Sequence, residues 1–121
     1  MDINERRKHQ RYNAPENSFA VLLSDNLIGP IDNLSLGGVS FTCIACSKQR
    51  YGKNTLEMFS KDRNFYLREI PFKVVSEVDL ENQMPLISVQ MKQISGEFIE
   101  LSEYQSSQLE FFIQNFAAID S

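Results

Sequence analysis

The sequence contains no tryptophan and no long apolar stretch, and the second absence limits what the chain can be. Its longest uninterrupted apolar run is Phe19 to Leu23, far shorter than the roughly 20 residues of a membrane-spanning helix. The first residues, Met1 to Glu5, lack the apolar segment of a secretion signal. We therefore expect a cytoplasmic protein that does not insert into a membrane.

Cysteine and histidine are scarce, which argues against a disulfide framework, a metal site and the common forms of catalysis. The chain has two cysteines, Cys43 and Cys46, and His9 is its single histidine. A structural zinc ion usually takes four cysteine or histidine ligands, and this chain has too few. No sequence pattern of a nucleophilic serine, a phosphate-binding loop or a metal-binding helix occurs. We expect packed or idle thiols, an exposed His9, no metal, no cofactor and no enzymatic activity.

The charge is acidic overall but unevenly distributed. Twelve basic residues against sixteen acidic ones give a net charge of −4. A general nucleic-acid-binding protein needs a large basic surface, so we expect no nucleic-acid polymer as the partner. Residues 1–76 carry a net charge of +3 and residues 77–121 one of −7, and four of the bases lie within Arg6–Arg11. A small basic locus on an acidic protein predicts a small anion, or an acidic patch of a partner, as its target.

The chain has the length and the 42% apolar composition of one domain with its own core. Residues 1–17 are polar and lack apolar periodicity, so we expect a flexible basic arm. From residue 18 apolar and polar residues alternate, which predicts short strands. Residues 18–121 are therefore expected to form a small antiparallel barrel that ends in a helix over about 102–118.

Turn signals made of small and polar residues separate the expected strands. Strands are expected at 19–23, 27–34, 39–43, 56–59, 65–75, 87–92 and 98–101, with turns or loops at 24–26, 37–38, 46–54, 79–83 and 95–96. Gly29-Pro30 predicts an edge position or a bulge in the second strand, because proline cannot donate to a ladder. Imperfect alternation over 65–75 predicts a bulge there as well.

The last segment changes from a strand period to a helical one. An apolar stripe recurs at helical spacing and predicts a face that packs against the barrel. Its members are Leu109, Phe112, Ile113, Phe116 and Ala117. Ser102 is the expected N-cap of this helix, with Gln105 at the capping-box position.

Two short motifs contain residue types that bind phosphates and bases. The first is Arg7-Lys8-His9-Gln10-Arg11, in which two arginines stand four residues apart. A guanidinium can hold a phosphate with two hydrogen bonds, contact the O6 and N7 edge of a guanine, or stack on a base. The second is Asn33-Leu34-Ser35-Leu36-Gly37-Gly38, where short polar side chains precede a glycine pair. Glycines let a ligand approach the backbone closely.

In this order, and about 22 residues apart, the two motifs resemble those of the PilZ domain family. The family pattern is an RxxxR arm, matched here by Arg7 and Arg11, followed by [D/N]xSxxG, matched by Asn33, Ser35 and Gly38. The resemblance covers about residues 5–117. It implies an all-β fold, a six-stranded antiparallel barrel with a C-terminal helix.

The resemblance also implies a ligand, the bacterial second messenger cyclic di-GMP, which has two guanines and a charge of −2. It implies that Arg7 and Arg11 hold phosphates and guanine edges, that Asn33 and Ser35 bond a guanine, and that Gly37-Gly38 leaves room for the base. The commoner motif has aspartate where this chain has Asn33. An amide offers one acceptor oxygen where a carboxylate offers two, so a weaker or differently oriented contact is expected.

Arg6 stands immediately before the arginine motif. The sequence leaves two roles open for its guanidinium. The guanidinium is either solvated, or it stacks on a second, intercalated molecule of cyclic di-GMP. The number of ligands per domain, one or two, separates the two.

The function that the resemblance implies is a cyclic di-GMP receptor that changes conformation and signals to a partner protein, with motility, biofilm or polysaccharide synthesis as outputs. We expect ligand binding to fold the arm over the barrel. The main alternative is a ligand-independent adaptor that binds its partner through the acidic face of the helix. A binder of RNA or single-stranded DNA is disfavoured by the acidic charge. The sequence leaves a homodimer open.

Overall fold

The structure, a computed structural model, describes residues 9–44, 52–80 and 91–119. These residues form one sheet, one α-helix and a short 3-10 turn at Leu23–Asp25. The strands are β1 (Tyr12–Asn13), β2 (Ser18–Leu22), β3 (Leu27–Leu34), β4 (Gly38–Ile44), β5 (Gly52–Ser60), β6 (Phe65–Leu80), β7 (Met91–Phe98) and β8 (Ala118–Ile119). The helix is α1 (Glu103–Phe116). No helix among the described residues is long and apolar enough to cross a membrane.

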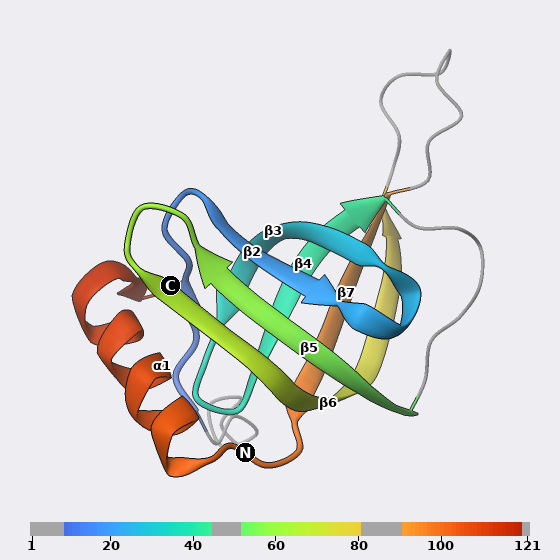
Figure 1. The fold of residues 1–121 in the computed structure, drawn as a ribbon. Coiled ribbons are helices and arrows are strands. Elements are labelled where there is room, and N and C mark those ends of the chain that lie inside the picture. The colour runs from blue at the N-terminus through green and yellow to red at the C-terminus, as the bar shows by residue number, and fades with distance from the viewer. Residues whose placement is uncertain (1–8, 45–51, 81–90, 120–121) are drawn as a thin grey trace, which may run out of the picture.

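Six of the strands close into an antiparallel barrel (Figure 1). Their order is β2-β5-β6-β7-β4-β3, and β2 pairs with β3 to complete the ring. The two shortest strands extend the sheet beyond β3, because β1 pairs with β3 and β8 pairs with β1. The six-stranded barrel confirms the fold that the sequence resemblance implied.

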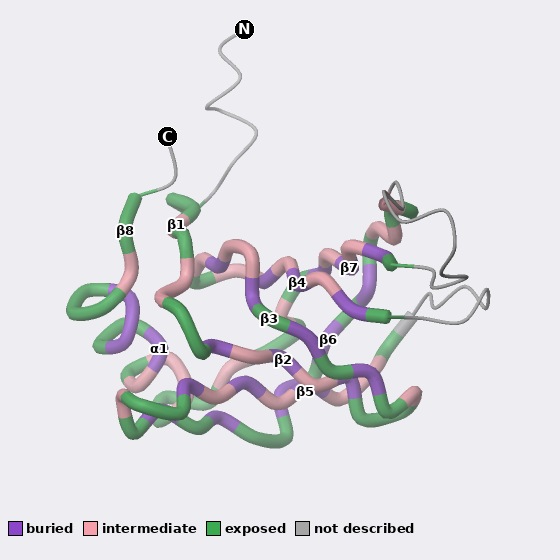
Figure 2. The backbone as a smooth tube through the Cα atoms, turned by 90° about the horizontal axis from the view of Figure 1, so that it is seen from above, coloured by how far each residue is buried: buried purple, intermediate pink, exposed green. Residues whose placement is uncertain are grey.

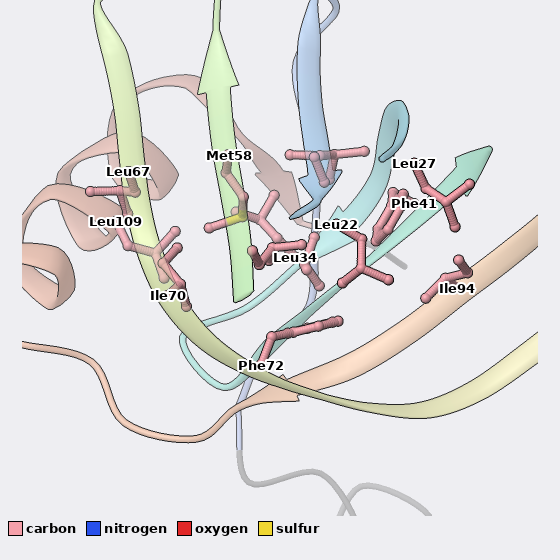
Figure 3. Close-up of a cluster of buried hydrophobic side chains, with 14 of the residues drawn as sticks. Leu22, Leu27, Leu34, Phe41, Met58, Leu67, Ile70, Phe72, Ile94 and Leu109 are labelled. Atoms are coloured by element: carbon pink, nitrogen blue, oxygen red, sulfur yellow. The ribbon is translucent and has the colours of Figure 1, made fainter. Parts of the chain in front are cut away.

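The alternation in the sequence becomes the two sides of the barrel wall. In β2 the side chains of Ala20 and Leu22 are fully buried, whereas Phe19 and Val21, which alternate with them, are half-buried on the outside. Figure 2 shows the same change between buried and less buried positions along the strands. Figure 3 shows buried side chains from all six barrel strands meeting inside the ring. Burial of this apolar surface is the main force that favours the barrel over the open chain.

Three bulges interrupt the ladders and change which side chains face outward. Between β3 and β4 the register shifts at Asp32, and between β6 and β7 it shifts at Val75. Between β5 and β6 two residues, Arg68 and Glu69, lie opposite Glu57, and Glu69 has a positive φ of 56°. The extra residue in a bulge bends the strand and resets the phase of its side chains. The bulges expected in the second strand and over 65–75 are thereby confirmed.

The helix α1 begins with the capping box that the sequence predicts. The Ser102 hydroxyl accepts a hydrogen bond from the Gln105 backbone N–H at 3.0 Å, and the Gln105 side chain accepts one from the Ser102 backbone N–H at 2.9 Å. The two bonds satisfy backbone donors that the first turn of a helix leaves without partners. The Gln105 amide also donates to the backbone oxygen of Arg68, which attaches this helix end to β6.

One face of α1 covers an end of the barrel (Figure 1). Leu109, Phe112 and Ile113 are buried, and the Phe112 ring stacks on Phe65 with 4.0 Å between ring centroids. The sequence also predicted Phe116 on the buried face, which is wrong. Its side chain is 40% exposed and lies beside the Arg63 guanidinium, whose carbon is 5.8 Å from the ring centroid.

The expected turn at Ser95-Gly96 is also wrong, because both residues lie within β7 and pair with β4 and β6. Gly96 is required for space: a Cβ there would overlap the Lys73 carbonyl oxygen and the Phe72 ring. The glycine lets a large core side chain pack against the strand backbone. Glycine is favoured both in turns and where a strand packs closely against a large side chain, so the Ser95-Gly96 pattern was misinterpreted as a turn.

Several expected boundaries differ from the observed ones. Residues 52–54, expected in a loop, begin β5, and residues 79–80, expected in a turn, end β6. Of the strand expected at 98–101 only Phe98 belongs to a strand. The strand expected at 87–92 lies largely outside the described residues, as do the remaining parts of the loop over 46–54 and the turn over 79–83.

The N-terminal segment that the sequence assigns to an arm contributes to the sheet. Tyr12 pairs with Leu34 of β3 on one side and with Ile119 of β8 on the other. The side chains of Tyr12 and Ala14 pack against the core. Residues 12–14 are therefore part of the folded domain, although their polar neighbours gave no strand signal.

Candidate functional site

The pairing of β1 with β3 brings the two sequence motifs together. Asn13 lies opposite Asn33, and Tyr12 lies opposite Leu34. Arg11 immediately precedes β1, so its backbone is held beside the end of β3, where the second motif begins. Two segments about 22 residues apart in sequence thus meet through a two-residue strand. This strand is the structural reason that an arginine on the arm can act with Asn33.

The serine of the second motif holds the β3–β4 turn in shape. The Ser35 hydroxyl oxygen accepts hydrogen bonds from the backbone N–H groups of Gly37 and Gly38, at 3.0 and 3.2 Å. The Ser35 backbone N–H donates to the Gly38 carbonyl at 2.9 Å and closes the turn. The sequence interpretation gave Ser35 a contact with the ligand. The structure adds a positioning role, because the oxygen is already engaged with the glycine backbone.

Close approach of backbone requires glycine at position 38, and at position 37 the neighbour is a side chain of the arm. A Cβ at Gly38 would overlap the carbonyl oxygen of Gly96 in β7. A Cβ at Gly37 would lie 2.5 Å from Cδ2 of His9, so the imidazole of the arm rests against the turn. The Gly37 carbonyl accepts a hydrogen bond from the Phe98 backbone N–H at 2.9 Å. The turn is thus packed between the arm and β7.

These residues surround a pocket of 460 Å³ on the outside of the barrel. It is lined by His9, Arg11, Asn33, Ser35, Gly37, Gly38, Val39, Ser40, Val75, Ser95, Gly96, Glu97 and Phe98. Five of the seven site residues predicted from sequence are in this lining. The other two, Arg6 and Arg7, lie outside the described residues.

The two bulges near the pocket aim side chains into it. The bulge at Asp32 places Asn33 opposite Ser40 on the outer face, between the buried Ile31 and Leu34. The bulge in β6 leaves Val75 without a partner on β7, and this exposed side chain lines the pocket. Bulges are frequent beside functional sites because they redirect side chains.

The floor of the pocket carries small polar side chains that are already hydrogen-bonded. Ser40 and Ser95 face each other across β4 and β7, with 2.7 Å between their hydroxyl oxygens. One row further along the strands, outside the pocket lining, the Asp32 carboxylate accepts from Thr42 at 2.7 Å and from Gln93 at 3.1 Å. These cross-strand bonds fix a low, polar surface on which a flat ligand can lie.

Sequence reasoning missed several residues of the pocket. His9 is exposed as expected, but its ring also contacts the turn. Ser40 lay in an expected strand whose alternation showed only that it faces outward, Ser95 was assigned to a turn, and Glu97 belonged to no expected strand. Their pairing across β4 and β7 depends on the register, which no local pattern reveals.

The chemistry of this site is that of binding. Arg11 provides a fixed positive charge with several donors, and backbone and hydroxyl groups provide further donors and acceptors. Within residues 9–44, 52–80 and 91–119 no group of three histidine, cysteine or acidic side chains is arranged to hold a metal ion. Cys43 is buried in the core, as the interpretation of packed thiols expected, and Cys46 lies outside the described residues.

Comparison with known proteins gives a match at the level of structure. No family model matches the sequence, and no curated protein matches it. Among solved structures, the chain is similar to one described as the PilZ domain with c-di-GMP of YcgR from Escherichia coli. The TM-score is 0.68 and the identity 19%, with 92% of this chain and 91% of that chain covered. A likeness at this identity shows a shared fold over nearly the whole of both chains.

Proposed function

We propose that this chain, which has the fold of a PilZ domain, is a receptor for cyclic di-GMP. The observation that carries the proposal is the convergence of Arg11, Asn33, Ser35 and the glycine pair on one pocket of a barrel whose fold is shared with a domain solved with that ligand. The motifs were recognised from sequence alone, whereas the pocket arises from strand pairing, so the two lines of support are separate.

The ligand and the pocket match in charge and in shape. Cyclic di-GMP is a dianion with two flat bases, and the pocket combines an arginine with glycine backbone and small hydroxyl side chains. In the proposal Arg7 and Arg11 hold phosphate oxygens and the O6 and N7 edge of a guanine. Asn33 bonds the base from the barrel side, and Gly37-Gly38 gives the base room beside the backbone.

The strand pairing provides a path from the ligand to the rest of the protein. β1 lies between β3, which carries Asn33, and β8, which follows α1. We infer that closure of the arm on the ligand shifts β1, and that β8 passes this shift to the helix. The receptor then signals through a changed surface that a downstream partner binds.

Calorimetric titration of the full chain tests the proposed ligand. Cyclic di-GMP should give saturable heat and raise the melting temperature, because a ligand that binds only the folded state stabilises it. Cyclic di-AMP, GMP and ATP at the same concentrations are the controls and should do neither. The fitted stoichiometry distinguishes one ligand from the two that a stacking Arg6 would allow. No saturation with cyclic di-GMP at high micromolar concentration would contradict the proposal.

A ligand-independent adaptor is the second candidate, and the helix surface is the observation that favours it. Tyr104 and Phe111 on α1 are 68% and 60% exposed. They stand seven residues apart on a helix that also carries Glu103 and Glu110. A pull-down with and without cyclic di-GMP separates the candidates, because an adaptor retains its partner equally in both conditions. The same material, analysed by light scattering, tests for a homodimer.

A further inference from the structure

Glu97 is an acidic residue in a pocket that is proposed to bind a dianion. It is the only acidic side chain among the described residues that line the pocket. A carboxylate near two phosphates lowers affinity through repulsion unless it makes a bond that compensates. Its presence in the same lining as Arg11 is explained if the ligand presents hydrogen-bond donors to it.

The structure holds Glu97 in a defined place. In β7 it lies opposite Gly38 of β4 and opposite Lys73 of β6. Strand alternation puts it on the outer face with Ser95, which bonds Ser40. Since Gly38 has no side chain, the flank of Glu97 toward the turn is open.

The backbone around Glu97 is fixed by the same turn. A Cβ on Gly38 would lie 3.3 Å from the Glu97 Cα, so the two strands are in close contact there. The next residue, Phe98, donates its backbone N–H to Gly37 at 2.9 Å. A side chain on such a supported backbone needs to order only its own rotamer when it binds a ligand, which lowers the entropic cost of binding.

The chemistry of the carboxylate complements one edge of guanine. The Watson–Crick edge of guanine carries two adjacent donors, N1–H and N2–H, and an ionised carboxylate offers two acceptor oxygens at matching separation. Asn33 has one acceptor oxygen and cannot accept from both donors through it. We propose, on the basis of the cyclic di-GMP function above, that Glu97 accepts N1–H and N2–H of one guanine and thereby determines the specificity of the site for guanine.

This role predicts which nucleotides the site rejects. Adenine presents the N1 lone pair and one amino donor on the same edge, so a carboxylate there faces an acceptor and loses one of its two bonds. A site built for a particular hydrogen-bond pattern discriminates strongly against a ligand that leaves its polar groups without partners. Cyclic di-AMP has the same charge and backbone, and therefore isolates the contribution of the base.

The variant Glu97→Gln tests the inference, with Glu100→Gln as the matched control. Both substitutions remove one negative charge from neighbouring exposed positions, and only Glu97 lines the pocket. In calorimetric titrations of the full chain, Glu97→Gln should weaken cyclic di-GMP binding about 5- to 100-fold, the range for loss of a paired base contact. It should also reduce the preference for cyclic di-GMP over cyclic di-AMP, because an amide offers both a donor and an acceptor to the edge of the base. Glu100→Gln should bind like the wild type.

An increase in cyclic di-GMP affinity in Glu97→Gln would identify the competing explanation, repulsion between Glu97 and the phosphates. If Glu97 only repels the phosphates, Glu97→Gln binds cyclic di-GMP more tightly, and that result overturns the inference. If Glu97→Gln leaves both the affinity for cyclic di-GMP and the preference over cyclic di-AMP unchanged, the inference is also overturned. Saturable binding of cyclic di-GMP by the wild-type chain leaves the proposed function standing in either case. A wild-type chain that shows no saturable binding overturns the proposed function and this inference with it. A second variant, Glu97→Asp, keeps both acceptor oxygens and should retain the preference for guanine over adenine.

Discussion

Two hollows of nearly equal volume on the outer surface of the described barrel residues differ in what lines them. The pocket beside the β3–β4 turn measures 460 Å³, and the hollow at the β5–β6 turn measures 440 Å³. The first is lined largely by glycines, serines and Arg11. The second is lined largely by long side chains, among them Phe59, Tyr66 and Lys61.

Two long side chains of the second hollow, Tyr66 and Phe59, already have partners within the protein. Tyr66 donates its hydroxyl hydrogen to Glu57 at 2.9 Å, and Phe59 stacks on Phe19 with 5.5 Å between centroids. In the pocket beside the β3–β4 turn, the small residues use short cross-strand bonds and leave backbone and Arg11 accessible to a ligand. The comparison teaches that volume alone does not make a binding site. Short outward side chains and close backbone approach make the difference, since each hollow has a cation in its lining, Arg11 or Lys61.

Replacement of Arg11 by alanine should give the largest loss of cyclic di-GMP affinity, compared with the matched replacement in the second hollow. Loss of a charged donor to the phosphates should weaken cyclic di-GMP binding by about 1.5–3 kcal/mol, the range for hydrogen bonds to charged groups. Lys61→Ala removes the same charge from the lining of the second hollow and is the control. Calorimetry measures both affinities. Equal losses in the two variants would mean that only the overall charge of the protein matters.

Gly38→Ala should have the second-largest effect, and it should act by shifting the backbone. The added methyl would overlap the Gly96 carbonyl oxygen, so β4 and β7 must separate at the pocket. Overpacking of this kind typically costs about 1–3 kcal/mol of folding stability, which thermal or urea unfolding measures. Cyclic di-GMP affinity should fall as well, because the strands that carry Ser40 and Glu97 move.

Gly37→Ala is the control for this substitution, since its methyl would meet only the His9 ring among the nearest atoms. A side chain can rotate away at lower cost than a strand can shift, so the loss of stability should be smaller. An equal loss in both variants would show that the turn, and not the contact between β4 and β7, limits stability.

Much of the fold was predictable because local patterns determine it. The alternation in β2 and β4 and the capping box of Ser102 and Gln105 each depend on neighbours in sequence, and the structure confirms them. The lining of the candidate site was predictable as far as the motifs extend, which gave Arg11, Asn33 and the residues of the turn.

The remaining features depend on contacts between distant segments. Gly96 was assigned to a turn because its role, the admission of the Phe72 ring, depends on a neighbouring strand. The strand β1 was missed because two residues carry no measurable alternation, and its pairing with β3 and β8 is determined by tertiary structure. Glu97 belonged to neither sequence motif, since only the register with Gly38 places it in the pocket. Register is a global property of the sheet.

The smallest effect is expected on the titration of Tyr66 in the second hollow. This titration tests whether the second hollow is independent of ligand binding beside the β3–β4 turn. The hydrogen bond to Glu57 raises the pKa of Tyr66 above its ordinary value of 10.0, with lesser contributions from burial and from the Glu57 charge. The phenol donates this bond only while protonated, so the bond stabilises the fold below the ordinary pKa and is lost as the pH rises through the raised one. Glu57→Ala should lower the Tyr66 pKa in an ultraviolet titration, whereas Glu110→Ala, on α1, should leave it unchanged. Cyclic di-GMP should not move this titration if the ligand binds only beside the β3–β4 turn. A shift of the Tyr66 titration on addition of the ligand would instead couple the two hollows and remove the distinction between them.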